Sequence, residues 1–185
     1  MSTSRFMWAT LVWLGFSLMP SIAVYAEDQR EYGFGRPATE AEIKAWDIDV
    51  GPTGAALPLG RGTVQQGAAI YANKCASCHG PTGTEGSQNR LVGGRGSLAT
   101  AQPIKTIGSY WPYAATLYDY IYRAMPFTAP QSLTPDEVYA LVAWLLHQNG
   151  IIPKNAVMDA RTLPAVTMPN RAGFASDPQP DMPVR

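Results

Sequence analysis

Two cysteines and a histidine stand close together in the chain, in the pentapeptide Cys75-Ala76-Ser77-Cys78-His79. Two thiols at this spacing lie on one turn of chain, where each can add to a vinyl group of the same haem. The histidine that follows directly can then bind the haem iron. The motif therefore predicts one covalently bound haem c, with Cys75 and Cys78 as anchors and His79 as an iron ligand.

Three other interpretations of this motif are weaker. A disulfide between Cys75 and Cys78 would close a very small loop and stabilise the fold little. A thioredoxin-like redox pair needs a strand–helix–strand setting, which the surrounding sequence does not suggest. A zinc site needs four ligands, and His147 is the only histidine or cysteine outside the motif.

Composition excludes several classes of function. The chain has 185 residues with 14 basic and 14 acidic side chains, so neither a nucleic-acid-binding stripe nor an acidic tail is indicated. The motif uses both cysteines, which excludes a disulfide framework. No nucleophile, general base or carboxylate pair suited to catalysis stands out. We therefore expect no catalytic residues in this chain.

Residues 1–26 have the pattern of a secretory signal. Arg5 precedes an apolar run from Phe6 to Met19, and Val24-Tyr25-Ala26 fits a small-residue cleavage site. The pattern predicts export to the periplasm, where haem c is attached, and a mature chain that begins at Glu27. Retention of the segment as a membrane anchor is the alternative.

Residues 27–62 are predicted to form an extended N-terminal arm. A short helix should run from Thr39 to Trp46, with Thr39 as its N-cap and Glu42 completing a capping box. Glycine and proline then favour extended coil. Four apolar residues indicate an ordered arm on the domain or on a partner, rather than a disordered leader: Trp46, Ile48, Val50 and Leu57.

Residues 63–150 should form the haem domain, which we expect to be all-α. A first helix runs from Thr63 to Cys75, and Gly67 allows another helix to cross it closely. A second spans Tyr113 to Ala124, and its face Leu117, Tyr120, Ile121 and Ala124 is expected to wall the haem pocket.

The third helix has the clearest start and stop signals. Thr134 is its N-cap, Pro135 sits at the first position, Glu137 completes a capping box, and Gly150 stops it. Its predicted buried stripe consists of Val138, Leu141, Val142, Leu145 and Leu146, with Trp144 and His147 off that stripe.

A long irregular segment, residues 80–112, is expected to cover one side of the haem. A backbone carbonyl within Leu91–Gly94 should accept the Nδ1 proton of His79 and fix the orientation of its ring. Five side chains are candidates to bind the haem propionates: Arg90, Arg95, Lys105, Tyr110 and Trp111.

Met125 is the candidate for the sixth iron ligand. It follows the second helix directly, Pro126 restrains the backbone beside it, and a thioether ligand raises the reduction potential. The alternatives are Met158, Met168, Met182 and His147, of which the methionines are by default gap-fillers.

Residues 151–185 contain six prolines and should form an extended C-terminal arm without regular structure. We expect residues 151–176 to lie on a partner, with residues 33–58 as a second strap, and the chain beyond Asp177 to be flexible. Deleting residues 151–185 should then leave the fold nearly intact.

The order of these features over residues 63–150 resembles a class I cytochrome c domain, which implies three or four helices around one haem. Over residues 33–174 the chain is similar to SoxD-type cytochrome subunits of Sox sulfite (sulfane) dehydrogenases. The segments that carry this resemblance are Gly35–Thr39, Trp46–Val50, Pro103–Tyr113, Tyr118–Ile121, Arg123–Phe127, Gln131–Thr134 and Met168–Arg171.

The resemblance implies a partner subunit with a molybdenum cofactor, of the sulfite oxidase family, and electron transfer from it to a downstream cytochrome. It also implies that Cys75 and Cys78 hold haem while His79 and Met125 bind iron. Two departures are visible: a single haem motif, and Gln88-Asn89-Arg90 where a proline often precedes the Leu-x-Gly. A freely diffusing electron carrier is the alternative function, and a small-ligand sensor is disfavoured by Met125.

Overall fold

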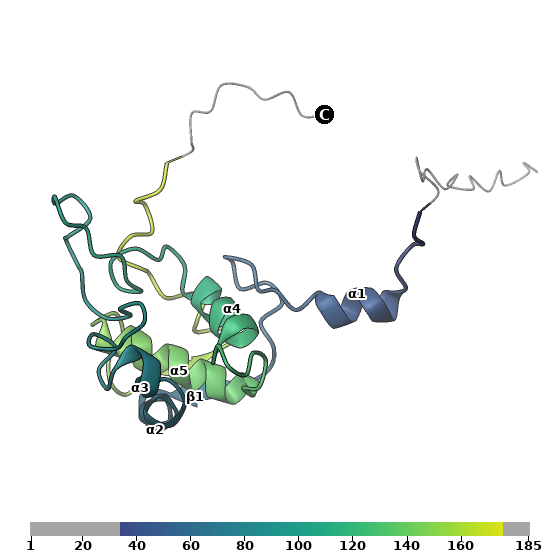
Figure 1. Ribbon diagram of the computed structural model, residues 1–185, viewed down its shortest axis with the longest axis horizontal. Helices are drawn as coiled ribbons and strands as arrows, with labels where there is room; N and C mark the ends of the chain where they lie inside the picture. Colours follow the sequence, from purple (N-terminus) through teal and green to yellow (C-terminus); the bar gives the residue numbers. More distant parts are fainter. Residues whose placement is uncertain (1–33, 176–185) are drawn as a thin grey trace, which may run out of the picture. The chain divides into compact units, whose positions relative to one another are not determined.

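The computed structural model describes residues 34–175. The chain divides into two units, residues 1–38 and 39–185. The predicted signal segment 1–26, Met182 and the tail beyond Asp177 lie outside the described residues. No helix within the described part is long and apolar enough to cross a membrane. In chain order, the elements of the described residues are α1 (Glu40–Trp46), β1 (Arg61–Thr63), α2 (Val64–Lys74), α3 (Ala76–His79), α4 (Ala114–Ala124), α5 (Pro135–Gln148) and β2 (Val157–Asp159). Figure 1 labels all of them except β2.

Helix α1 forms where its capping signals predict it. The Thr39 hydroxyl accepts from the Glu42 amide, and the Glu42 carboxylate accepts from the Thr39 amide at 2.8 Å. None of its residues is buried, and Trp46 is 86% exposed. The apolar residues of the arm therefore differ in burial: Val50 is buried in the domain, whereas Trp46 at the end of α1 is exposed.

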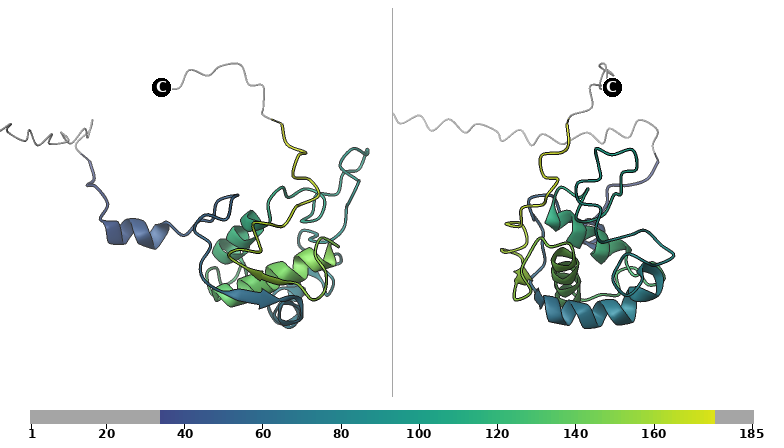
Figure 2. Two further views of the ribbon diagram at one scale, coloured as in Figure 1. Left: turned by 180° about the vertical axis from the view of Figure 1, so that it is seen from behind. Right: turned by 90° about the vertical axis from the view of Figure 1, so that its left-hand side faces the viewer.

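Helices α2 and α5 cross closely because glycine stands at the crossing. A Cβ on Gly67 would lie 1.9 Å from the Ala140 carbonyl oxygen, and one on Gly62 would lie 2.1 Å from the Ala140 nitrogen. The expected role of Gly67 is therefore confirmed. The crossing is steep: α2 is seen end-on in Figure 1 and lengthwise in the right-hand view of Figure 2.

Helix α5 is the centre of the core. Thr134 and Glu137 form the predicted capping box, and Gly150 adopts a positive φ of 65° directly after the C-cap Asn149. Every residue from Val138 to Leu146 is buried. Trp144 was expected off the buried stripe, but it stacks on Tyr71 of α2 with 3.9 Å between ring centroids. That expectation is wrong because α2 covers a second face of α5.

The segment after α5 packs on its own domain. Strand β2 pairs antiparallel with β1, with Met158 opposite Gly62. Met158, Leu163 and Met168 are at most 4% exposed and belong to the core. The expectation that residues 151–176 carry no regular element and lie on a partner is therefore wrong for the stretch up to Met168. The prolines stand outside the three paired residues, so they do not interrupt this short strand.

Candidate functional site

The Cys75–His79 motif forms one tight turn at the end of α2. Cys75 is both the C-cap of α2 and the residue before α3, and its carbonyl accepts from the amides of Cys78 and His79 at 3.2 and 3.0 Å. The two cysteines are not joined in a disulfide, and Cys75 is half-buried while Cys78 is exposed. Burial raises the pKa of the Cys75 thiol to about 11, against the opposing effect of Lys74, so the unmodified thiol is protonated at neutral pH.

The ring of His79 is oriented by a backbone carbonyl from the following loop. Its Nδ1 lies 2.9 Å from the carbonyl oxygen of Asn89, the geometry in which Nδ1–H donates and Nε2 keeps its lone pair. We expected this carbonyl between Leu91 and Gly94, and that prediction is wrong. The loop returns earlier, because the Gln88 amide donates to the Cys78 carbonyl at 3.0 Å.

Glycine permits this early return of the loop. A Cβ on Gly86 would lie 2.4 Å from the Cα of His79, so no other residue could pass the motif at this distance. Gly86 is the sequence signal that could have located the return, since a glycine in a loop marks a possible close approach of two backbones.

The motif opens onto a cavity of about 690 Å³. This volume lies within the usual range for sites that hold a small molecule or cofactor. Leu117 and Ile121 of α4 and Leu141 and Leu145 of α5 line it with apolar surface. Of the α4 face expected to wall the pocket, Leu117, Tyr120 and Ile121 line the cavity, whereas Ala124 does not. Tyr120 is also 47% exposed.

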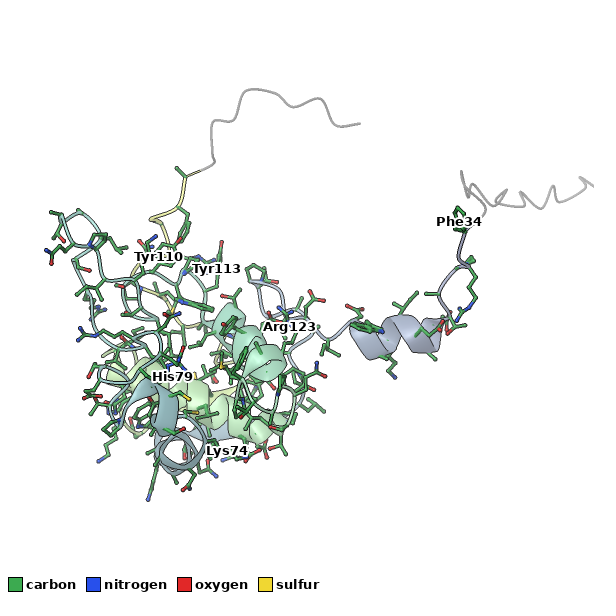
Figure 3. The ribbon with its side chains drawn as sticks, in the orientation of Figure 1. Phe34, Lys74, His79, Tyr110, Tyr113 and Arg123 are labelled. Carbon is green, nitrogen blue, oxygen red and sulfur yellow. The ribbon has the colours of Figure 1, made fainter. Side chains whose placement is uncertain are left out.

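Four predicted site residues meet at this cavity. Cys75, Cys78 and His79 line it from the α2–α3 end, and Met125, the C-cap of α4, lines it as well. Figure 3 labels His79 at α3 and Lys74 at the end of α2. Met158 and Met168 are buried and are not among the residues that line the cavity.

The residues present fit a haem. Two thiols, an imidazole and a thioether are the donor set of a c-type haem, and the apolar lining suits the ring. Within residues 34–175, no group of three or more His, Cys, Asp and Glu side chains could hold a metal ion. His147 does not line the cavity, and its Nδ1 lies 3.1 Å from the carbonyl oxygen of Ile152.

The charged groups at the cavity are cationic. Its described lining contains Lys74, Arg90 and Lys105 and no carboxylate. Lys74 is paired with Glu137 of α5 at 2.6 Å, and that hydrogen bond is the main reason why the pKa of Glu137 is lowered. Arg90 Nε donates to the Val92 carbonyl at 2.8 Å. Of the five predicted propionate donors, Arg90, Lys105 and Trp111 line the cavity, and Arg95 and Tyr110 do not.

Comparison with known proteins places the chain in a family. Residues 62–145 match the model of cytochrome c oxidase, cbb3-type, subunit III. A chain in the crystal structure of the sulfane dehydrogenase SoxCD from Paracoccus pantotrophus is 45% identical, with a TM-score of 0.74. The match covers 80% of the present chain and 73% of that chain. The chain is a SoxD-type c-type cytochrome. No curated protein sequence matches it.

The resemblance found in the sequence is thereby confirmed, for the cytochrome c domain and for the SoxD type. The family model ends at residue 145, whereas the match to the crystal structure covers 80% of the present chain. The likeness to the SoxCD chain therefore includes parts of the molecule outside the haem domain.

Proposed function

We propose that this SoxD-type cytochrome is the electron-accepting subunit of a periplasmic sulfite or sulfane dehydrogenase. It holds one haem c through thioether bonds to Cys75 and Cys78, and His79 and Met125 bind the iron. The haem supplies one-electron chemistry, and the chain encloses it, orients its histidine ligand and excludes water. The observation that carries the proposal is the meeting of these four side chains at one cavity.

The haem part of the proposal is tested by Met125→Ala. A ferric haem with histidine and methionine ligands has a weak near-infrared band from the thioether, which this substitution should abolish, together with a fall in reduction potential. Met158→Leu is the matched control and should keep the band, because Met158 is buried away from the cavity. Survival of the band in Met125→Ala would disprove the role of Met125.

The proposed partner is a molybdenum-cofactor subunit of the sulfite oxidase family, from which electrons pass to this haem and then to a downstream cytochrome. A freely diffusing carrier is the alternative, and it needs only the haem domain. The docked subunit is favoured because the match to the SoxCD chain extends beyond the domain that the family model covers.

Helix α1 is the part of the chain best suited to bind this partner. Ile43 and Trp46 lie three residues apart, on one face, and are 53% and 86% exposed. A capped helix with an exposed apolar face fits a groove on another protein. A seven-residue helix is marginal by itself, so such docking would also stabilise it.

Co-expression with the molybdenum subunit tests the partner. The wild-type chain should co-purify with that subunit and accept electrons from it when sulfite or a sulfane substrate is added. The double variant Ile43→Ser, Trp46→Ala should keep its haem spectrum and melting temperature but bind at least tenfold more weakly. Leu59→Ser is the matched control, since Leu59 is 92% exposed outside α1. A wild-type chain that remains separate from the molybdenum subunit would support the free carrier instead.

A further inference from the structure

Asn149 lies at the end of α5, on the side of the molecule where the haem loop returns. Its side chain is buried, with 8% of the residue exposed, and it makes three of the four hydrogen bonds that an asparagine side chain can make. The Oδ1 atom accepts from the Gly93 amide at 3.0 Å. The Nδ2 group donates to the carbonyl of Leu91 at 3.2 Å and to that of Leu145 at 2.9 Å. One side chain therefore ties α5 to two points of the loop.

The loop between these points and His79 is also held at its other end, where the Gln88 amide donates to the Cys78 carbonyl at 3.0 Å. The carbonyl that accepts from His79 belongs to Asn89, two residues before Leu91. Within the same loop, the Leu91 and Val92 amides donate to the Gly83 carbonyl at 2.8 and 3.2 Å. The Asn89 carbonyl is thus positioned by hydrogen bonds within the loop and by those from Asn149, which link Leu91 and Gly93 to helix α5.

The chain at Ile107 and Gly108, which forms another part of the cavity wall, also packs against the Asn149 side chain. A Cβ on Gly108 would lie 2.3 Å from Asn149 Oδ1, so this backbone rests directly on the asparagine. The neighbouring Ile107 lines the cavity, and its amide donates to the Leu91 carbonyl at 3.3 Å. Asn149 therefore joins both halves of the haem loop to α5.

We propose that Asn149 is a positioning residue for His79: by holding Leu91 and Gly93 it fixes the Asn89 carbonyl and, through it, the plane of the His79 ring. This inference rests on the proposed role of His79 as iron ligand. The hydrogen bond from Nδ1 to a carbonyl makes an imidazole a stronger donor and fixes its rotation. Without the Asn149 anchor, both effects should weaken.

The test uses the ferric and ferrous haem-loaded full chain. In Asn149→Ala, the proton NMR shifts of the haem methyl groups should change their spread, because these shifts report the orientation of the histidine plane. The reduction potential should rise, since a weaker donor favours the ferrous form. A threefold change in the ferrous-to-ferric ratio corresponds to about 28 mV, from about 59 mV for a tenfold change in a one-electron couple.

Asn149→Asp is the second variant, in case the alanine variant does not fold. It keeps an acceptor for the Gly93 amide but cannot donate to Leu91, so the spread of its haem methyl shifts should change as in Asn149→Ala. Its added negative charge itself lowers the potential, so the potential is compared for the alanine variant alone. Asn73→Ala is the matched asparagine control, because Asn73 donates only to the Ala69 carbonyl on the exposed face of α2. Val138→Ala, which loosens α5 away from the cavity, controls for general loss of stability.

A methyl pattern like that of wild type in both Asn149 variants would overturn the inference. A fall in the potential of Asn149→Ala would overturn it too, since that result would indicate entry of water and not a weaker histidine bond. An equal change of the methyl shifts and the potential in Val138→Ala would also overturn it, because Asn149 would then act only through the stability of the fold. Absence of covalent haem from the wild-type chain would instead refute the proposed function, so the two failures are distinguishable.

Discussion

Asp119 shows how one side chain fixes the point where the N-terminal arm reaches the domain. Its Oδ1 accepts from the buried Val50 amide at 2.8 Å and from Arg123 Nε at 2.9 Å, and its Oδ2 accepts from Arg123 as well. Burial opposes its ionisation, but these hydrogen bonds together with the charge of Arg123 outweigh burial and lower its pKa. Folding therefore stabilises the ionised form of Asp119.

Asp119→Ala should lower the free energy of unfolding by about 2 kcal/mol, because it leaves the buried Val50 amide without a partner. Arg123→Lys is the control and should cost less, since it keeps a cation beside the buried carboxylate and leaves the Val50 contact. Denaturant unfolding at pH 7 measures both. Equal losses in the two variants would contradict the assigned role of the Val50 bond.

The same carboxylate should make stability depend on pH. Because its pKa is lowered on folding, its contribution is fully present above the unfolded value, about 3.9, and is lost as the pH falls through the folded value. The difference in unfolding free energy between wild type and Asp119→Asn should therefore shrink below about pH 4. A difference that stays constant from pH 7 to pH 3 would exclude the effect.

The packing of α2 on α5 is the contact between elements that most constrains the domain. Gly67 of α2 and Gly62 of β1 carry no side chain, so both backbones approach α5 closely at Ala140, and Tyr71 of α2 stacks on Trp144 of α5. Tyr71 also lines the cavity, and its hydroxyl donates to the Gly80 carbonyl at 2.9 Å. The helix crossing therefore sets the position of the haem motif at the end of α2.

Gly67→Ala should destabilise the domain by about 3 kcal/mol, since the new methyl group would collide with the Ala140 backbone and push α2 off α5. Gly51→Ala is the matched control: a Cβ there meets nothing within 4 Å, and its φ is not positive, so the change should be neutral or slightly stabilising. Thermal unfolding of the haem-loaded variants compares them. A neutral Gly67→Ala would contradict the close crossing.

At the scale of the whole molecule, the C-terminal segment completes the domain. Beyond the core residues already described, Asn170 Nδ2 donates to the Tyr110 carbonyl at 2.9 Å, and the Arg171 guanidinium lies 4.1 Å from the centre of the Tyr113 ring. Tyr110 and Tyr113, labelled in Figure 3, flank Trp111, which lines the cavity. The segment thus covers the core and braces one wall of the haem site.

Truncation after Gly150 should therefore unfold or strongly destabilise the protein, contrary to the expectation from the sequence. Removing Met158, Leu163 and Met168 from the core costs about 2 kcal/mol for each side chain, which approaches the whole stability of a small domain. Truncation after Asp177 is the control, because the sequence predicts a flexible tail beyond that residue, and it should leave the melting temperature unchanged. If a chain ending at Gly150 has the melting temperature of the full chain, the result would support the original hypothesis that residues 151–176 bind a partner.

The sequence by itself determined the local features of this protein. The haem motif, the capping boxes of α1 and α5, the glycine that ends α5 and the methionine that ends α4 all depend on residues within a few positions of one another. Hydrogen bonds between residues three or four apart form wherever the chain turns into helix, so their residue pattern is sufficient to predict them.

Only the tertiary structure decided which distant parts of the chain meet. The partner of Asn149 at Leu91 is 58 residues away in sequence, and that of Asp119 at Val50 is 69 residues away. The Asn89 carbonyl, the burial of Trp144 and the return of Met158 beside Gly62 likewise depend on how loops close. A polar or apolar residue can satisfy its contacts with any suitable partner, and only the packed chain determines which partner lies within reach.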